Sequence, residues 1–260
     1  MVTAELPTVR PDRHVFATMG TVVSIAFAQG VPDGAGEAVE AVFSELDQRF
    51  SLYRPDSEAS AVARRELGVR QASAEFRAAY DLAAEWSART ERAFTPHRPD
   101  GVVDLAGVVK AMAIQAAADV LHARRAHNWC LNAGGDVLVD GAAAVTDVAD
   151  LAATKPWVVG IVDPTDRTQL LSQFSTTPQL PAVATSGTAE RGEHVWRMAS
   201  SDTFAQVSVA APDIMTADVL ATAILAGGRW TLDLATRRWP VEVLAVTRAG
   251  EFFATAAFRT

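Results

Sequence analysis

The chain has 260 residues, of which 49% are hydrophobic and 21% are charged, a composition typical of a globular protein that is long enough to bury a substantial core. Its formal net charge is -8, so it lacks the positive field that holds a polyphosphate backbone, and we do not expect a nucleic-acid partner. The single cysteine, Cys130, excludes an internal disulfide, and its apolar neighbours favour a buried thiol without a catalytic role.

The N-terminal residues carry charges and prolines but no apolar stretch of the kind found in a secretory signal, so we expect a cytoplasmic protein. We also expect a flexible segment over residues 1–13. No apolar run is long enough to span a bilayer, because even the richest, near residues 217–228, is short and contains Asp218.

The first part of the chain predicts strands followed by helices. β-prone residues between Val15 and Phe27 surround a Met-Gly-Thr sequence, which indicates two short strands or one strand bent at Gly20, where the backbone can approach a ligand closely. Apolar residues at helical spacing predict helices over residues 38–50, 73–90 and 107–125. Between the first two, an irregular segment with a short polar helix is expected.

In the remaining chain, predicted strands and helices follow one another without a regular order. Residues 129–139 predict two strands joined by a tight Asn-Ala-Gly-Gly-Asp turn, and the alanine-rich residues 141–155 indicate a loop or a loosely held helix. Further strands are expected over residues 157–163, 183–185, 204–210, 241–246 and 251–254, with a helix over residues 216–226. Because strands and helices mix without regular alternation, an α+β fold is favoured over a doubly wound sheet.

Asp218 and Thr222 are polar exceptions in the apolar helix predicted over residues 216–226. They stand four residues apart, so they share one helical face. A carboxylate in apolar surroundings requires a partner, and a hard cation such as Mg²⁺, which prefers oxygen ligands, would satisfy it. The alternative is that Asp218 caps amides at the helix start while Thr222 bonds to its own helix.

Asp104 and Lys110 flank Gly107 where the third long helix is expected to begin. Free amides at a helix start, with a lysine nearby, form an anion site suited to phosphate. Asp104 as a simple helix cap and Lys110 as a solvated residue are the alternative.

A third polar cluster follows the strand predicted over residues 183–185. Thr185 and Ser186 offer hydroxyls beside a glycine that permits close backbone approach, and His194 can donate to a ligand. A plain strand-to-turn junction with an exposed histidine is the alternative, and residues 132–136 can likewise form nothing beyond a hairpin turn.

Taken together and in order, these segments resemble the ApbE-like FAD:protein FMN transferase family over nearly the whole chain. The matching segments are residues 19–21, 51–53, 57–60, 104–110, 132–136, 157–161, 183–187, 217–218 and 221–222. The resemblance implies one α+β, T-fold-like domain over residues 14–260, with mixed or antiparallel sheets flanked by helices, as a monomer or homodimer.

The resemblance also implies a site. The substrate FAD would contact Met19, Tyr53, Ala93, Phe94, Thr95, Asp104, Lys110 and His194. We add Thr185 and Ser186 to this set because their hydroxyls can bind a ligand. Mg²⁺ would be held by Asp218, Thr222 and the main-chain carbonyl of Gly107. The implied reaction cleaves the FAD pyrophosphate, attaches FMN through a phosphoester to a Thr or Ser of an acceptor flavoprotein and releases AMP. Asp218 would also orient or deprotonate the incoming hydroxyl.

Several positions depart from the family pattern. Phe-Thr-Pro-His at residues 94–97 replaces the family's Phe-Asp-Pro-Thr, and residues 195–199, which include Arg197, lack its Asp-Pro-x-Thr-Gly. Ala111 stands in place of a glycine, Gln115 in place of an acid, and an asparagine expected near Ala63 is absent. Because the proposed metal pair is spared, three hypotheses remain: an active FMN transferase, an enzyme that hydrolyses FAD to FMN and AMP, and a non-catalytic flavin-binding protein.

Overall fold

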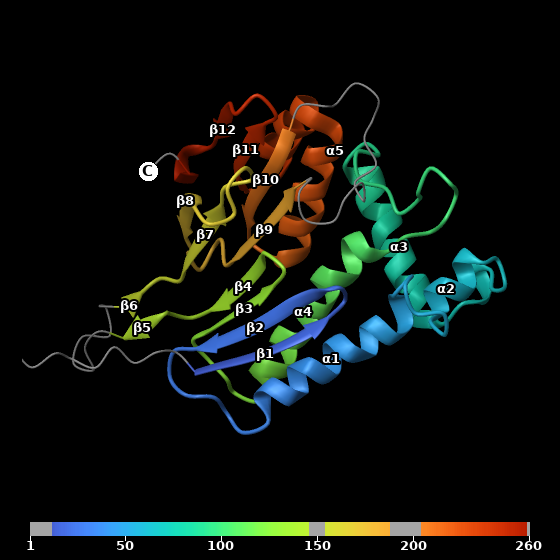
Figure 1. Ribbon diagram of the computed structural model, residues 1–260, viewed down its shortest axis with the longest axis horizontal. Coiled ribbons are helices and arrows are strands. Elements are labelled where there is room, and N and C mark those ends of the chain that lie inside the picture. The colour runs from blue at the N-terminus through green and yellow to red at the C-terminus, as the bar shows by residue number, and fades with distance from the viewer. Residues whose placement is uncertain (1–11, 146–153, 188–203, 259–260) are drawn as a thin grey trace, which may run out of the picture.

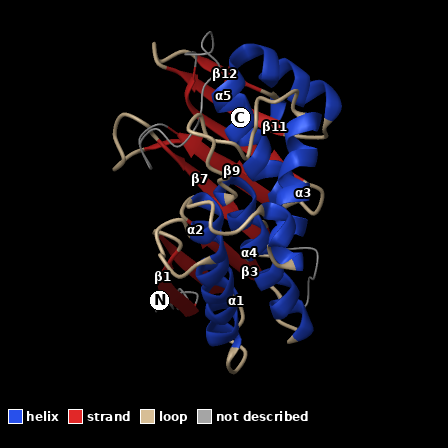
Figure 2. Cartoon of the chain, turned by 90° about the vertical axis from the view of Figure 1, so that its right-hand side faces the viewer, coloured by secondary structure: helices blue, strands red, loops and turns tan. Residues whose placement is uncertain are grey.

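The computed structural model describes residues 12–145, 154–187 and 204–258. Its centre is an eight-stranded sheet with the order β1-β2-β3-β4-β9-β10-β11-β12, in which every neighbouring pair is antiparallel. The helices cover one face of this sheet, as the view along its edge shows (Figures 1 and 2). The predicted α+β fold with an antiparallel sheet flanked by helices is therefore confirmed.

The elements have the following bounds. The large sheet contains β1 (Asp12–Thr18), β2 (Thr21–Phe27), β3 (Trp129–Ala133), β4 (Asp136–Asp140), β9 (Ala182–Gly187), β10 (Phe204–Ala211), β11 (Glu242–Thr247) and β12 (Phe252–Ala254). Two small antiparallel pairs are β5 (Ala144–Val145) with β6 (Thr154–Lys155), and β7 (Val158–Val162) with β8 (Leu170–Ser175). The α-helices are α1 (Ala35–Phe50), α2 (Glu58–Ala63), α3 (Ala74–Arg89), α4 (Ala106–Ala123) and α5 (Ile214–Arg238). Short 3-10 helices cover Val69–Gln71 and Ala256–Phe258.

Apolar cores lie on both faces of the sheet. On the helical face, alternate residues of β2 (Val23, Ile25 and Phe27) are fully buried in one large cluster with α1, α4 and α5. On the other face, β4, β9, β10 and β11 pack against β7, β8 and the C-terminal 3-10 helix in a second, smaller cluster. The centre of the sheet is thus covered on both sides, whereas Val15 of the edge strand β1 remains 58% exposed.

Two tight turns lie next to each other at one end of the sheet. Met19 and Gly20 connect β1 to β2 with φ angles of 49° and 68°, and Gly134 and Gly135 connect β3 to β4 with φ angles of 62° and 93°. Positive φ at both central residues is the geometry that best suits the twist of a two-residue hairpin. A Cβ atom on Gly134 would lie only 2.3 Å from Oγ1 of Thr21, so the two turns are in close contact. The alternative of two strands in this region is confirmed.

Strand register gathers further segments at the same end. Ala133 pairs with Val23 and with Asp136, Val137 pairs with Val183, and Ser186 pairs with Val207. The start of β2, the end of β3, the start of β4 and the end of β9 therefore share one end of the sheet. We call it the glycine-turn end, defined by residues 19–21, 134–136 and 185–187.

The second half of the chain differs from the sequence-based expectations in three places. The expected loop or helix over residues 141–155 contains β5 and β6, with residues 146–153 outside the described ranges. Strand β8 was not expected, because its alternate residues are mostly polar or exposed. The helix expected over residues 216–226 begins at Ile214, and after a kink at Gly228, whose φ of 67° and ψ of -151° are non-helical, a second helical segment that was not expected continues to Arg238. Within the described ranges, no helix combines the length and apolarity needed to cross a membrane.

Candidate functional site

Helix α5 carries the acid and hydroxyl that the sequence singled out. Asp218 is only 4% exposed, and Oγ1 of Thr222 lies 3.0 Å from Oγ of Ser186 on β9, within hydrogen-bonding distance. Helix capping, the alternative role for Asp218, belongs to Asp213, whose Oδ1 accepts a 2.7 Å hydrogen bond from the main-chain N–H of Thr216. The Thr222 hydroxyl therefore links α5 to the glycine-turn end of the sheet.

Lys110 and Asp136 form an ion pair between α4 and the first residue of β4. Asp136 is 0% exposed, and its Oδ1 accepts a hydrogen bond of 3.2 Å from the main-chain N–H of Thr185. The Lys110 side chain is 14% exposed, so the solvated alternative for this residue is wrong. The Thr185 hydroxyl continues the network to Oγ of Ser208 on β10, at 2.8 Å.

The start of α4 lies against residues 93–95. A Cβ atom on Gly107 would come within 2.6 Å of the Phe94 ring, and one on Gly227 of α5 would lie 2.9 Å from Cβ of Ala93. These two glycines thus allow residues 93–95 to pack closely against both helices. Oδ1 of Asp104 accepts a 3.0 Å hydrogen bond from the main-chain N–H of Ala106, but the N-cap position of α4 is Leu105, so Asp104 lies one residue before the cap.

Thr95 stands where the family has an aspartate. Its hydroxyl accepts a hydrogen bond of 3.2 Å from the main-chain N–H of His97. This contact is local, so Thr95 helps to shape the turn in which it lies.

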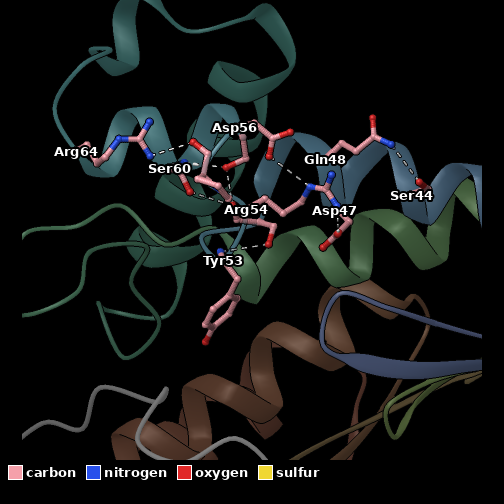
Figure 3. Close-up of polar contacts among 11 residues, drawn as sticks. Ser44, Asp47, Gln48, Tyr53, Arg54, Asp56, Ser60 and Arg64 are labelled. Carbon is pink, nitrogen blue, oxygen red and sulfur yellow. Dashed lines mark hydrogen bonds and ion pairs between the residues drawn. The ribbon is translucent and has the colours of Figure 1, made fainter.

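Tyr53 lies in the connection between α1 and α2 and is 84% exposed. The connection is held by polar contacts on its other side, where Arg54 approaches Asp47 and Asp56 at 3.7 and 3.8 Å and Ser57 caps α2. Figure 3 shows the Tyr53 ring directed away from these groups. The connection is therefore held by polar contacts on one side and presents an exposed aromatic ring on the other.

The other predicted contacts divide into two groups. Met19 lies in the β1–β2 turn at the glycine-turn end and is partly buried against the main core. His194 lies outside the described residues, as does Arg197, which was named only as a departure from the family pattern.

Cys130 lies on β3, paired with Val139 of β4 and away from the glycine-turn end. Burial raises the pKa of its thiol to about 12, opposed by the nearby positive charge of Arg13. The thiol is therefore protonated near neutral pH, which agrees with the absence of a catalytic role.

The residues predicted to hold a cation have suitable chemistry. A buried carboxylate, a hydroxyl one turn further along the helix and a main-chain carbonyl are all hard oxygen donors of the kind that Mg²⁺ prefers. Among residues 12–145, 154–187 and 204–258, no three His, Cys, Asp or Glu side chains form a group able to hold a metal. The predicted set contains one such side chain, Asp218, and would leave the other coordination positions to phosphate and water.

Sequence reasoning did not assign roles to Asp136, Ser208 or Asp213. Asp136 was treated as part of a turn, although a carboxylate that opens a strand of apolar residues is itself a signal of a buried partner. Ser208 is a fully buried polar residue of β10. The start of α5 was placed at Thr216, so Asp213 was not recognised as its cap.

The chain was compared with known proteins. A model described as the ApbE family matches residues 19–98 and 96–245. No curated protein matches.

Three solved structures share the fold. The ApbE protein from Thermotoga maritima has a TM-score of 0.72 at 18% identity, covering 95% of this chain and 97% of its own. Flavin transferase ApbE from Vibrio cholerae has a TM-score of 0.70 at 20% identity, with coverages of 96% and 99%. Pseudomonas stutzeri flavinyl transferase ApbE in its apo form has a TM-score of 0.74 at 17% identity, with coverages of 97% and 98%.

Proposed function

This chain belongs to the ApbE family, and from that premise we propose that it is a Mg²⁺-dependent FAD:protein FMN transferase. It cleaves the pyrophosphate of FAD, joins FMN through a phosphoester to a Thr or Ser of an acceptor flavoprotein, and releases AMP. The observation that carries the proposal is the Ser186–Thr222 contact of 3.0 Å, because it brings the acid-bearing face of α5 to the glycine-turn end of the sheet. The names of the V. cholerae and P. stutzeri proteins, flavin and flavinyl transferase, support the same activity.

FAD is proposed to bind across the glycine-turn end. Met19 lies in one of its two turns, and Lys110 supplies a positive charge suited to the pyrophosphate. Tyr53 offers an exposed ring, and the packed residues 93–95 form a wall beside the start of α4. Asp104, Thr185, Ser186 and His194 complete the proposed contact set.

Asp218, Thr222 and the main-chain carbonyl of Gly107 would hold Mg²⁺. Bound there, the ion would neutralise charge on the pyrophosphate and stabilise the charge that develops on the AMP leaving group. The burial of Asp218 supports this role, since a carboxylate removed from water requires a compensating charge or strong hydrogen bonds.

The reaction exchanges one phosphorus–oxygen bond for another. The acceptor hydroxyl oxygen attacks the FMN phosphorus, and the bond from that phosphorus to the bridging oxygen breaks, so that AMP leaves with the electron pair. Asp218 orients the hydroxyl or accepts its proton. The Ser186 contact holds Thr222 in place beside it.

The test uses purified protein incubated with FAD and Mg²⁺, with and without a candidate acceptor domain. We expect AMP in the solution and covalently attached, fluorescent flavin on the acceptor. AMP with only free FMN would instead support a hydrolase, and intact bound FAD a non-catalytic flavin-binding protein. A chain that binds no flavin would overturn all three.

A further inference from the structure

We propose that Asp136 is a positioning residue, which fixes the Lys110 ammonium group and the end of β9 where the FAD pyrophosphate is bound. The inference rests on the proposed function and adds a residue to its phosphate-binding part. Asp136 opens β4 directly after the Gly134–Gly135 turn, so it is held by a rigid hairpin.

The two carboxylate oxygens of Asp136 serve two different elements. Oδ2 pairs with the Lys110 ammonium group of α4, and Oδ1 accepts the main-chain N–H of Thr185 on β9. Because the side chain is only 1% exposed and both oxygens contact protein groups, Asp136 acts on a ligand through these neighbours rather than by direct contact.

Lysine needs such a partner in order to act at a defined place. Its ammonium group is a compact charge on a flexible four-carbon stem, so an unpaired Lys110 would sample many positions. Pairing with a buried carboxylate restricts it, and the surrounding low dielectric strengthens its attraction for a phosphate. Lys110 keeps 14% of its side chain exposed, so the paired residue still reaches the surface of the site.

Asp136 also orders the hydroxyls of β9. Asp136 accepts a hydrogen bond from the main-chain N–H of Thr185, and the Thr185 hydroxyl contacts Ser208. The next residue of β9, Ser186, contacts Thr222. One carboxylate therefore connects the phosphate-binding lysine to the strand that supports the proposed cation site.

The Asp136→Asn variant tests this role. It retains the size of the side chain and an oxygen for the Thr185 N–H, but it loses the charge that restrains Lys110. We expect FAD affinity, measured by quenching of flavin fluorescence, to fall about tenfold, the size expected when a charged hydrogen bond is lost. The sensitivity of the affinity to KCl should also change, because the variant alters the charge beside the proposed phosphate position.

Asp140→Asn is the matched control. Asp140 ends the same strand at the opposite end of the sheet, where its partners are His122, His127 and the main-chain N–H of Asn128. The same loss of charge there should leave both FAD affinity and its salt dependence at the wild-type values.

A double-mutant cycle shows whether Asp136 acts through Lys110. Lys110→Met alone and Lys110→Met combined with Asp136→Asn should bind FAD with the same affinity within about twofold, because the carboxylate has nothing left to position. Independent, multiplicative losses would overturn the proposal. So would folded Asp136→Asn protein with wild-type affinity and salt dependence.

A second variant covers the case in which Asp136→Asn does not fold. Asp136→Glu keeps the charge but moves it by one methylene group, so FAD affinity should fall while a cooperative thermal transition is retained. Unchanged affinity in this variant would refute the positioning role. Failure of the wild-type protein to bind FAD at all would refute the proposed function instead, which separates the two ideas.

Discussion

The two ends of the central sheet use the same residue types in different ways. At the glycine-turn end, Asp136 is fully buried and joins α4 to β9. At the opposite end, Asp140 is partly exposed and approaches the exposed side chains of His122 and His127. The comparison teaches that an aspartate indicates a site when it is buried and connects distant elements. An aspartate whose partners are exposed to solvent does not.

The largest effect is expected from Asp218→Ala, which removes the buried acid of α5, one helical turn from the Thr222 that contacts the glycine-turn end. Mg²⁺-dependent AMP release should fall by more than about 100-fold, because the substitution removes the one side chain that is proposed both to hold the ion and to orient the nucleophile. Thermal unfolding should remain cooperative. Asp233→Ala, at a half-exposed position of the same helix, provides the control and should retain activity. Normal AMP release from Asp218→Ala would overturn the role proposed for Asp218.

A pair of glycine substitutions compares the packing of the two ends. Gly134 and Gly30 both have positive φ, at 62° and 75°, but a Cβ on Gly134 would meet Oγ1 of Thr21 at 2.3 Å, whereas one on Gly30 would meet nothing within 4 Å. The backbone strain is therefore similar, and the crowding differs. Gly134→Ala should lower the free energy of unfolding by about 1–3 kcal/mol more than Gly30→Ala does, as measured in urea. Equal losses would show that the contact between the two turns is unimportant.

Cys130 provides a pH-dependent test of the region beyond the glycine-turn end. Its thiol pKa is about 12 in the folded protein and 9.0 in the reference state, so the folded state holds the proton more tightly. This stabilisation is complete below the unfolded pKa and is lost as the pH rises from about 9 toward 12. By pH 10 the wild type should have lost about 1 kcal/mol more unfolding free energy than Cys130→Ala, relative to pH 7. Parallel curves for the two proteins would contradict this account.

The smallest effect is expected from His127→Ala. The imidazole is 67% exposed and lies 3.5 Å from Asp140, so the pair is solvated. Exposed pairs of this kind contribute about 0.2–1 kcal/mol, and the change should be close to the limit of a urea titration. AMP release should be unaffected. A clear loss of activity would extend the site to the opposite end of the sheet.

The sequence predicted most of the fold, because its signals are local. The turn between β3 and β4 was found from consecutive glycines between apolar residues, and α4 from helical spacing. The helical segment after Gly228 was missed because Gly227 and Gly228 are typical of a helix end, and Gly228 does leave the helical conformation. The local pattern does not show that the chain resumes a helix after this kink.

The sequence predicted which residues belong to the candidate site but not which of them contact one another. Asp218 and Thr222 were recognised because they interrupt an apolar face, a property that periodicity reveals. The pairing of Lys110 with Asp136 depends on where α4 crosses the end of the sheet, and no local pattern contains that information. The network from Asp136 to Thr185 likewise depends on strand register.

The links that define the glycine-turn end span much of the chain, since Thr21 packs on Gly134 and Ser186 contacts Thr222. During synthesis the first strands and α4 emerge long before α5, and domains acquire such distant contacts only when the later segment is available. A nascent chain still lacking α5 can therefore begin to form its hairpins but does not yet contain Asp218 and Thr222. If the proposed function holds, FAD binding would have to wait until α5 has been synthesised.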